Sequence, residues 1–527
     1  MKKNILLAIA LVFSLGIHAQ GEMDAIRMSA TELQGTARGQ AMGGAFGALG
    51  GDITGIAINP AGLGVYRSSE INATVDFSSV NINSNWNGNA LKESKFNFIC
   101  NNISYIGYLP TGDESLPAFN IGFSYHRIKD FNRDYQVAGR GMHSSLTDYI
   151  AESSYEIGSD DLLDGDRYDP YNSGHPWLSI LGFQGNLIHN AVNENDQTID
   201  DVYTSWLGRG ETVSPNLWVS ERGNIVSYDF SAGANISNQF YLGLTLAVTD
   251  INYQLSSFYK ETFGNNEHIG LKNDFQTTGS GYQVNVGAIW RPADFLRLGI
   301  AYHSPTYYTL TDRYFGHATA SYTFGDGSHS NDWAKSPEDA YTDYHFNTPY
   351  SWVFSAAGIL GTKAIISADY EVKDYTNMNL MDIYQVENTI DNHTIDQDFK
   401  TASTLRAGFE YRFTPQFSGR LGYSWVENPY EKGFKNKFAD PGIVRTVPHF
   451  VLEGDTHYYT AGIGYRITPQ WYLDVAFVYR TQTDDLYYFP KYWKDRNDGT
   501  PFALVDSSPA KLKNTGYKGL ITLGYKF

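Results

Sequence analysis

The chain has 527 residues and a formal net charge of -18, and 15% of its residues are aromatic. The acidic balance argues against nucleic acid as a partner, because phosphates need Lys and Arg. A single cysteine, Cys100, excludes a disulfide framework and a cysteine metal cluster. The mean hydropathy of -0.36 resembles that of a soluble protein, but a transmembrane barrel gives a similar average because half of each strand faces a polar lumen.

The first twenty residues are predicted to be an export signal. Lys2 and Lys3 form a basic start, and the mostly apolar run from Ile5 to Ile17 is too short to span a membrane as a helix. Cleavage after residues 1–20 leaves a mature chain that begins at about Gly21. No later apolar stretch is long enough for a transmembrane helix, so we expect an exported chain without one.

Residues 21–69 precede the first predicted strand and are rich in small residues. Glycines cluster at 35–39, 43–47 and 50–51, and no strand alternation is present. Glycine permits tight turns and lets a backbone approach its neighbour closely, and Pro60 pre-sets one turn. We predict a small plug that folds within a narrow lumen. A periplasmic extension or a glycine-rich linker is the alternative.

From about Glu70 the sequence alternates with the period of a strand. Between 240 and 248, for example, apolar Phe and Leu residues alternate with Tyr, Gly, Thr and Ala. A soluble sandwich also alternates, but here aromatic rings lie near the strand ends, which suits two membrane interfaces. The opposite face carries Arg, Asp and Glu, which fit a wet lumen better than a dry core.

This pattern predicts an all-β fold: a fourteen-stranded antiparallel transmembrane β-barrel over residues 70–527, with the N-terminal plug in its lumen. An even number of strands is typical of single-chain bacterial barrels. The predicted strands are 70–83, 96–109, 117–130, 222–236, 239–255, 277–291, 295–309, 348–360, 363–377, 401–413, 416–427, 456–467, 470–482 and 515–527.

The connections between these strands alternate between tight turns and longer segments. The tight turns carry turn-forming residues such as Ser237-Asn238 and Thr414-Pro415. The longer class begins with a modest connection at 84–95 and continues with long loops. Because short turns belong in the periplasm and long loops outside, both termini are predicted to be periplasmic. The long loops are 131–221, 256–276, 310–347, 378–400, 428–455 and 483–514.

The last predicted strand ends in an aromatic residue, Phe527, with Tyr525, Leu523 and Ile521 on the same face. A terminal amphipathic strand of this kind resembles the signal recognised by the outer-membrane barrel assembly machinery. We therefore expect that machinery to be a partner during biogenesis. The alternative is that the strand ends in an aromatic residue by chance.

The segment from Gly35 to Tyr66 resembles the plug, or hatch, of the FadL/TodX family of outer-membrane transporters. The resemblance covers about residues 30–80. It implies a passive transporter of long-chain fatty acids or other hydrophobic small molecules, with capture by outer loops, movement of the plug and sideways release. It assigns the plug motif to Arg38, Gly43, Gly44, Asn59, Pro60 and Ala61.

Two further sites follow from the resemblance. Family members release ligand through a kink in the third strand, which here places a lateral gate at Gly122; an ordinary strand glycine is the alternative. The apolar run that contains Trp177, Leu178 and Phe183 lies in a long outer loop. It is either a ligand-capture helix or a core that packs the loop.

Charged residues on the lumen side are predicted to form a ladder of salt bridges in preference to a carboxylate-binding site. These are Arg297, Arg406, Glu410, Arg412, Arg420, Arg466, Asp474 and Arg480. The histidines lack metal-ligand spacing, and the acidic loop from Asp160 to Asp169 departs from the EF-hand pattern. We expect no cofactor, no metal and no catalytic residue, since no nucleophile, base and orienter occur together.

The leading hypothesis is a monomeric outer-membrane transporter in a Gram-negative bacterium, surrounded by lipid and lipopolysaccharide. Two alternatives stay open. One is a FadL-like binding barrel that shuttles secreted proteins in type 9 secretion, and the other is a general porin.

Overall fold

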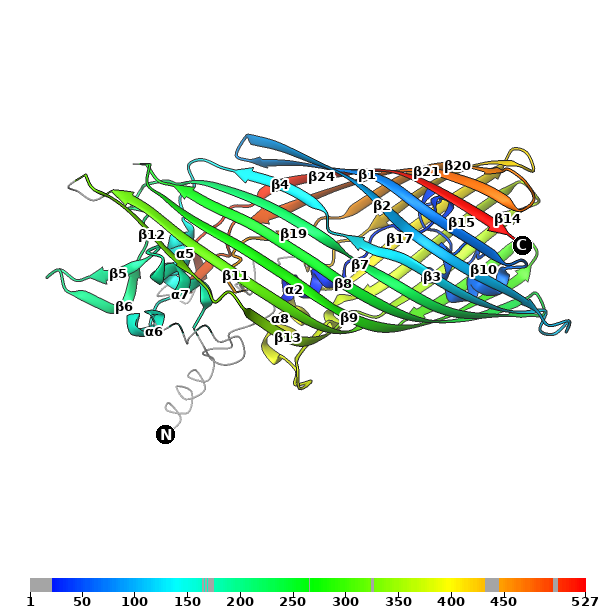
Figure 1. Ribbon diagram of the computed structural model, residues 1–527, viewed down its shortest axis with the longest axis horizontal. Helices are drawn as coiled ribbons and strands as arrows, with labels where there is room; N and C mark the ends of the chain where they lie inside the picture. Colours follow the sequence, from blue (N-terminus) through cyan, green and yellow to red (C-terminus); the bar gives the residue numbers. More distant parts are fainter. Residues whose placement is uncertain are drawn as a thin grey trace.

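A computed structural model describes residues 21–163, 165, 168, 175–264, 266–323, 327–431, 445–495 and 501–527. The predicted signal at residues 1–20 lies outside these ranges. Within them, fourteen antiparallel strands form a closed barrel, because β24 pairs back onto β1 from Lys526·Glu70 to Lys511·Asn85 (Figure 1). The predicted fold class is therefore correct.

The fourteen wall strands overlap all fourteen predicted ranges. In order around the barrel they are β1 (Glu70–Trp86), β2 (Asn89–Pro110), β3 (Ala118–Asp130), β7 (Ser214–Ile236), β8 (Phe240–Thr262), β9 (His268–Ala293), β10 (Leu296–His303), β14 (Ser351–Leu360), β15 (Ala364–Asp374), β17 (Thr401–Arg412), β18 (Phe417–Val426), β20 (Thr456–Arg466), β21 (Trp471–Tyr487) and β24 (Ala510–Lys526).

The outer face of the wall is apolar over a limited height. On β8 the exposed side chains run from Phe240 through Leu244 to Val248, and Asp250 ends the run. Phe240 stacks on Trp290 of β9, and Trp471 contacts Tyr525 of β24. These rings lie at the end of the barrel that carries the short turns, as an interfacial aromatic belt requires.

Two segments that were predicted as connections are strands. The segment 84–95 is no loop, because β1 and β2 continue to a two-residue turn at Asn87 and Gly88, both with positive φ. The segment 310–347 is mostly β11 (Tyr307–Thr323), β12 (His329–Lys335) and β13 (Ala340–Asn347). Their outward residues are mostly polar, with single exposed rings such as Trp333, because this part of the sheet rises beyond the apolar band, and the sequence therefore lacked the apolar alternation of a membrane strand.

The other long connections also fold. Residues 131–221 contain β4 (Arg133–Ala138), α5 (Leu146–Ser153), α6 (Ser159–Leu163), α7 (Trp177–Gln184), β5 (His189–Val192), β6 (Thr198–Thr204) and the start of β7. The remaining elements of this end are η3 (Tyr375–Asn377), β16 (Asn379–Asp382), α8 (Thr389–Asp398), β19 (Phe450–Leu452), β22 (Tyr492–Asp495) and β23 (Pro501–Val505).

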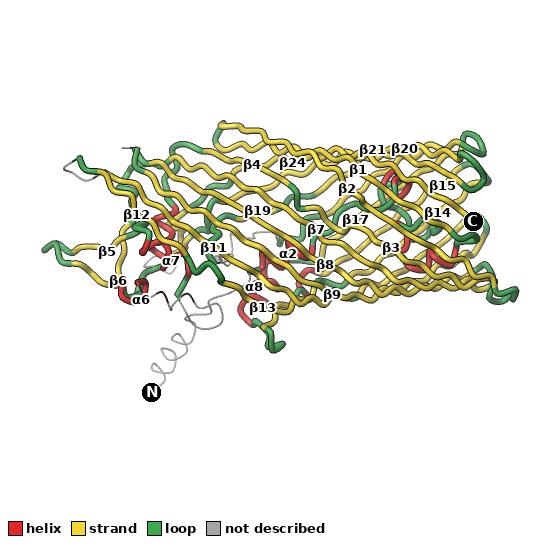
Figure 2. Tube along the Cα trace, in the orientation of Figure 1, coloured by secondary structure: helices red, strands yellow, loops and turns green. Residues whose placement is uncertain are grey.

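The N-terminal segment lies inside the barrel, and we call residues 21–66 the lumenal segment. It consists of α2 (Glu22–Ser29), α3 (Ala37–Ala41), α4 (Thr54–Ile58) and η1 (Pro60–Val65). Figure 2 shows these short helices enclosed by the strands. Helix α2 joins the large apolar core that fills the end with the long connections, whereas α3 and η1 contact the wall near the short turns. Among the described residues, no helix is long and apolar enough to cross a membrane.

Candidate functional site: the lumenal segment and the wall around it

The predicted Asn59-Pro60-Ala61 motif is a hydrogen-bonded turn pressed against the wall. The Asn59 side-chain amide donates to the carbonyl oxygens of Gly47 (2.7 Å) and Ala288 (3.2 Å), and its carbonyl accepts from the Ala61 N–H at 3.1 Å. Asn59 also caps η1, and Pro60 occupies the first position of that helix. One buried side chain thus joins two turns of the lumenal segment to strand β9.

Glycines in the wall leave room for this turn. A Cβ at Gly287 of β9 would lie 2.0 Å from the Asn59 Oδ1, and one at Gly243 of β8 would lie 2.1 Å from the Pro60 carbonyl carbon. Gly299 of β10 meets the Gly47 carbonyl in the same way, at 2.6 Å. These wall glycines form what we call the η1 seat. Any larger residue at these positions would push the lumenal segment away from the wall.

A second glycine seat receives the turn after α3. Gly408 of β17 and Gly422 of β18 approach Met42, and a Cβ at either would come within 2.6 Å of its backbone atoms. Gly43 and Gly44 both have positive φ, and a Cβ at Gly43 would lie 2.7 Å from the Tyr423 carbonyl oxygen. The lumenal segment is therefore held by backbone contact on two different parts of the wall.

Arg38 is part of a charged cluster on the side of the short turns. Its Nε lies 2.9 Å from a Glu410 carboxylate oxygen, and Arg420 lies 2.7 Å from the same oxygen. Arg420 also pairs with Asp474. The cavity lined by this cluster encloses about 230 Å³. Paired charges of this kind stiffen the wall and do not leave a free cation for a ligand.

The other predicted lumen charges have varied partners. Arg406 forms an ion pair with Glu371. Arg297 donates to the Leu49 carbonyl oxygen, and Arg412 donates to the Thr362 carbonyl oxygen at 3.4 Å. Arg480 donates to Gln482 and lines a further cavity. Arg466 lines the cavity beside Arg38. Most of the set therefore supports the wall or the lumenal segment.

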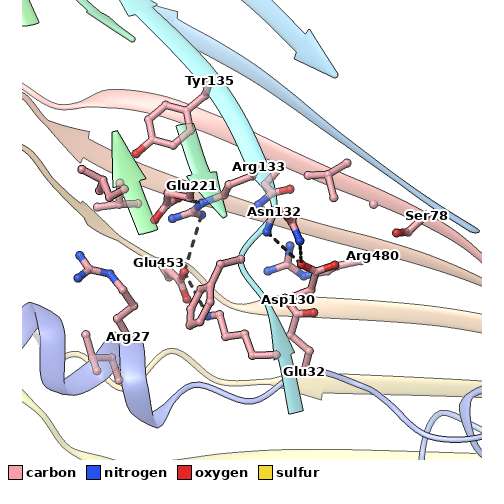
Figure 3. Close-up of a pocket in the computed structure, with 18 of the residues that line it drawn as sticks. Arg27, Glu32, Ser78, Asp130, Asn132, Arg133, Tyr135, Glu221, Glu453 and Arg480 are labelled. Atoms are coloured by element: carbon pink, nitrogen blue, oxygen red, sulfur yellow. Dashed lines mark hydrogen bonds and ion pairs between the residues drawn. The ribbon is translucent and has the colours of Figure 1, made fainter. Parts of the chain in front are cut away.

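That further cavity, which we call the side cavity, is shown in Figure 3 and lies between α2 and the start of β4. Its apolar surface comes from Met23, Ile26, Phe131, Leu255 and Phe450, and it encloses about 100 Å³. Its charged rim consists of Arg27, Glu32, Lys129, Asp130, Arg133, Glu221, Glu453, Arg480 and Lys518. A space with an apolar wall and a charged rim suits an amphiphilic molecule.

The rim charges are organised around the lumenal segment. Arg133 lies between Glu221, with which it forms an ion pair, and Glu453, at 3.9 Å (Figure 3). Burial disfavours the Glu32 carboxylate, but Lys518, Arg480 and Lys129 outweigh this effect and lower the pKa of Glu32. Glu32 therefore stays charged at neutral pH and keeps the lumenal segment attached to a cationic part of the wall.

Next to the side cavity the wall lacks a backbone ladder. Strand β2 pairs with β3 only from Pro110·Ala118 to Asn102·His126, whereas β4 pairs with β7. In the described part of the chain, residues 89–101 of β2 therefore have no strand partner on that side. We call this gap the seam. Side chains bridge it: Lys95 lies 3.5 Å from Asp134, and the Asn89 amide donates to the Ala138 carbonyl at 2.8 Å.

Two β-bulges mark the start of the seam, and both contact the lumenal segment. Asn101 is the extra residue of β2, and its amide donates to Gln34 at 2.7 Å while its carbonyl accepts from the Gly35 N–H. Ile128 is the extra residue of β3, and its carbonyl accepts from the Glu32 N–H at 3.1 Å. Bulges commonly end pairing and redirect side chains near functional sites.

The comparisons with known proteins agree with this geometry. Residues 226–487 match the family model described as outer membrane protein transport protein (OMPP1/FadL/TodX). These residues belong to the FadL/TodX family. The chain is accordingly an outer-membrane barrel of a Gram-negative bacterium, related to transporters of hydrophobic compounds. A comparison with curated proteins found no match.

Solved structures of the FadL type are similar over almost their whole length. The FadL homologue of Pseudomonas aeruginosa has 12% sequence identity and a TM-score of 0.51, with 94% of this chain and 99% of that chain covered. The toluene transporter TodX of P. putida has 13% identity and a TM-score of 0.48, and the toluene transporter TbuX of Ralstonia pickettii has 13% and 0.47, with the same coverage.

In this FadL-type barrel, the residue predicted as a lateral gate lies in a regular ladder. Gly122 of β3 pairs with Ile106 of β2 and with Ser231 of β7, without a shift of register. A Cβ there would touch Leu63 of the lumenal segment at 3.4 Å. The interruption in β3 lies six residues further on, at Ile128.

The residues predicted for ligand capture are mostly buried. Trp177 and Leu178 belong to the apolar core under α7, where the Trp177 ring contacts Tyr168 and Tyr314. Phe183 is partly buried and packs edge-on against Tyr203 at 5.4 Å. These contacts correspond to the loop-packing alternative. Part of the acidic loop, from Asp164 to Asp169, lies mostly outside the described residues. Elsewhere in the described chain, no group of acidic, His or Cys residues could hold a metal ion.

Sequence reasoning missed the seats and the seam of the FadL-type barrel. A signal for the seats was present, because Gly243, Gly287 and Gly299 occur on the polar face of predicted strands, where a pairing partner could be suspected. The bulges at Asn101 and Ile128 left a weaker signal. Each shifts the alternation by one residue, and the predicted ranges ran through both without a break.

Proposed function

We propose that this protein passively transports hydrophobic small molecules, such as long-chain fatty acids, across the outer membrane and releases them sideways through the seam. The observation that carries the proposal is the unpaired stretch of β2 at residues 89–101, with the side cavity lined by β4 on the other side of this gap. The family description and the resemblance of the lumenal segment to a hatch support the same function.

The position of the seam suits release into lipid. The outward side chains of β3 are apolar from Phe119 to Phe123, and the charged Arg127 follows the apolar run just before the bulge at Ile128, so the pairing ends near the outer edge of the apolar band. Phe96 and Phe98 on the unpaired part of β2 are 66% and 62% exposed. They form an apolar surface along which a hydrophobic molecule can pass from the cavity into the membrane.

The lumenal segment supplies the moving part in this mechanism. Its two glycine seats hold residues 37–66, whereas residues 21–35 contact the cavity and both bulges. Ligand in the side cavity would compete with α2 for apolar surface, and a shift of Glu32 away from Ile128 would open the cavity toward the seam. The alternation of short turns and long connections predicts both termini in the periplasm. The chain ends there in this proposal, beside Trp471 at the end with the short turns, whereas the described chain begins with α2 inside the lumen, against the apolar core of the other end.

A cross-link across the seam tests the proposal. Lys95→Cys and Asp134→Cys, in a Cys100→Ser background, place two thiols on its two sides, and a short cleavable bismaleimide joins them. We expect cells that carry the linked barrel to take up labelled oleate at least tenfold more slowly, with recovery after cleavage of the linker.

The matched control is Asp134→Cys with Ser220→Cys, which lie opposite each other in the regular β4–β7 ladder. Linking this pair leaves the seam free, so oleate uptake stays at the level of the unlinked protein. Unchanged uptake with the seam linked would refute sideways release. Purified barrel that carries no apolar ligand by mass spectrometry, but retains large secreted proteins, would favour the shuttle function instead.

A further inference from the structure

A tall part of the wall rises beyond the apolar band on one side of the barrel. Strands β7, β8, β9 and β11 continue past the band, and β12 pairs with β11 at their outer end (Figure 1). Phe258 lies ten residues beyond Val248, the last apolar residue of the band on β8. With a rise of about 3.3 Å per residue and a tilt of about 45°, Phe258 stands about 23 Å above the band.

Aromatic and basic side chains occupy one line across these strands. The cross-strand partners in order are Trp218, Phe258, Lys272, His317 and Lys335, and Trp333 lies diagonally next to His317. All six side chains occupy outward positions of their strands, and the residues next to them in the sequence face the core. We call these six residues the outer row. Trp218, Phe258 and Trp333 are 37%, 39% and 62% exposed, and they lie in one line in a zone without hydrocarbon.

The rings of the outer row lie in two pairs. Trp218 and Phe258 lie nearly parallel, with centroids 5.7 Å apart and 26° between their planes. Gly270 of β9, two residues before Lys272, lies diagonally opposite Phe258, and a Cβ at Gly270 would lie 3.2 Å from that ring. His317 and Trp333 form a second pair at 6.0 Å. The two aromatic pairs are separated by a cation and not by further apolar residues.

This spacing fits a saccharide better than a protein. The centre of a protein interface is more apolar than the rest of the surface and depleted of charged residues, whereas here Lys272, His317 and Lys335 interrupt the rings. A sugar presents an apolar C–H face that packs on an aromatic ring, and hydroxyls or phosphates that accept hydrogen bonds from ammonium groups. Lys272 pairs with Asp274 at 2.9 Å and Lys335 with Glu338 at 2.5 Å, but each ammonium has three donors, so donors remain for a phosphate.

We propose that the outer row binds the phosphorylated core saccharide of lipopolysaccharide in the surrounding outer leaflet. The lipid face of the barrel is continuous with this surface, so a glycolipid whose acyl chains lie against β7–β9 would extend its sugars along the same strands. The height of about 23 Å above the band places the rings at the saccharide and not at the acyl chains. The proposal is independent of the nature of the transported molecule.

The test compares two purified glycolipids, full-core lipopolysaccharide and lipid A without a core, for binding to the full-length barrel in detergent by native mass spectrometry. We expect at least tenfold tighter binding of the full-core form. Replacement of the three aromatic residues, Trp218→Ala, Phe258→Ala and Trp333→Ala together, should remove this preference and leave binding of lipid A unchanged.

The control replaces exposed aromatics elsewhere, Tyr155→Ala and Tyr384→Ala, and should retain the preference. Heat-modifiable gel mobility checks assembly, and Trp333→Ala alone serves if the triple variant does not assemble, since that ring is the most exposed of the three. Dephosphorylated core should bind more weakly than the phosphorylated core. Equal binding of both glycolipids by the wild type, or an unchanged preference in the triple variant, would overturn the proposal. The outer row would then be interpreted as a binding surface for a protein.

Discussion

At the residue scale, the close fit between Asn59 and the wall depends on the absence of a side chain. Asn59 is 1% exposed, and its amide donates to the backbone carbonyls of Gly47, Ala288 and Ile300 at a place where Gly287 leaves room for the side chain. The motif in the lumenal segment and the glycines of the η1 seat therefore form one unit, although more than 180 positions separate them.

Gly287→Ala tests this unit. The new Cβ would lie 2.0 Å from the Asn59 Oδ1, so Asn59 or β9 must shift, at a cost of about 1–3 kcal/mol. We expect the loss to appear locally, as hydrogen exchange at the Ala61 amide that is about 5 to 150 times faster. Mass spectrometry of peptides from residues 55–66 measures it.

Gly519→Ala is the matched control, because Gly519 also lies on a wall strand and nothing stands within 4 Å of its added Cβ. Exchange at Ala61 should not change in that variant. If Gly287→Ala leaves exchange at Ala61 as slow as in the wild type, the seat does not hold the turn in the way its geometry implies.

Residues of the lumenal segment could be selected from the sequence, but their partners could not. Asn59, Pro60 and Ala61 stand in a short run with no alternation, so they can be recognised from the neighbouring residues alone. The glycines that receive them lie on strands where glycine is common, and only the closed barrel brings Gly243, Gly287 and Gly299 to one height. The polar-face position of these glycines suggests a close neighbour, but a single sequence does not say which residue that neighbour is.

At the scale of elements, the membrane strands could be predicted and the outer strands could not. β8 can be recognised in the sequence because apolar residues occur at every second position over the height of the band. In β11, by contrast, the buried Tyr308, Leu310 and Tyr314 alternate with polar outward residues. That pattern is equally typical of a solvent-exposed loop with packed aromatics. Pairing of β11 with β9 and β13 settles the matter, and this pairing depends on the tertiary structure.

Helix α8 provides a prediction about pH. Asp391 is 4% exposed in its first turn, and burial raises the pKa of Asp391 to about 8. Because the pKa in the folded state exceeds that of an unfolded aspartate, the stabilising contribution is complete below about pH 4 and is lost as the pH rises to 8. We expect α8 to lose up to about 1 kcal/mol of local stability per pH unit in this window.

Hydrogen exchange of residues 389–398 between pH 5 and 8, corrected for the intrinsic rate, measures this effect. Asp391→Asn keeps the size of the side chain and removes the charge, so its protection should not vary with pH over the same range. A variant that keeps the pH slope of the wild type would show that another group is responsible, such as the Asp24 carboxyl, whose pKa burial also raises.

At the scale of the whole molecule, the lumen is divided by a segment that contacts wall strands on several sides. Helix α3 contacts β18, β20, β21 and β24, and η1 contacts β3, β7, β8 and β9. The charged cluster around Arg38 lies on one side, and the apolar core that includes α2 fills the other. In the described part of the chain, the lumenal segment thus lies across the axis of the barrel, where a general porin has a wide water-filled path.

Conductance in planar bilayers distinguishes these two kinds of barrel. We expect the wild type to conduct ions poorly and a variant that lacks residues 21–66, but keeps the first twenty residues, to conduct at least ten times more, because both seats would then face open lumen. If the deletion variant does not assemble, the double variant Gly43→Ala, Gly287→Ala takes its place. It loosens the contact at both seats and keeps the segment, and we expect it also to conduct more than the wild type. A wild-type barrel that already conducts like an open channel would identify a porin, since the seats would then have to release the segment at rest. A poorly conducting wild type, combined with oleate uptake that depends on the seam, leaves the wall and not the axis as the route for the transported molecule.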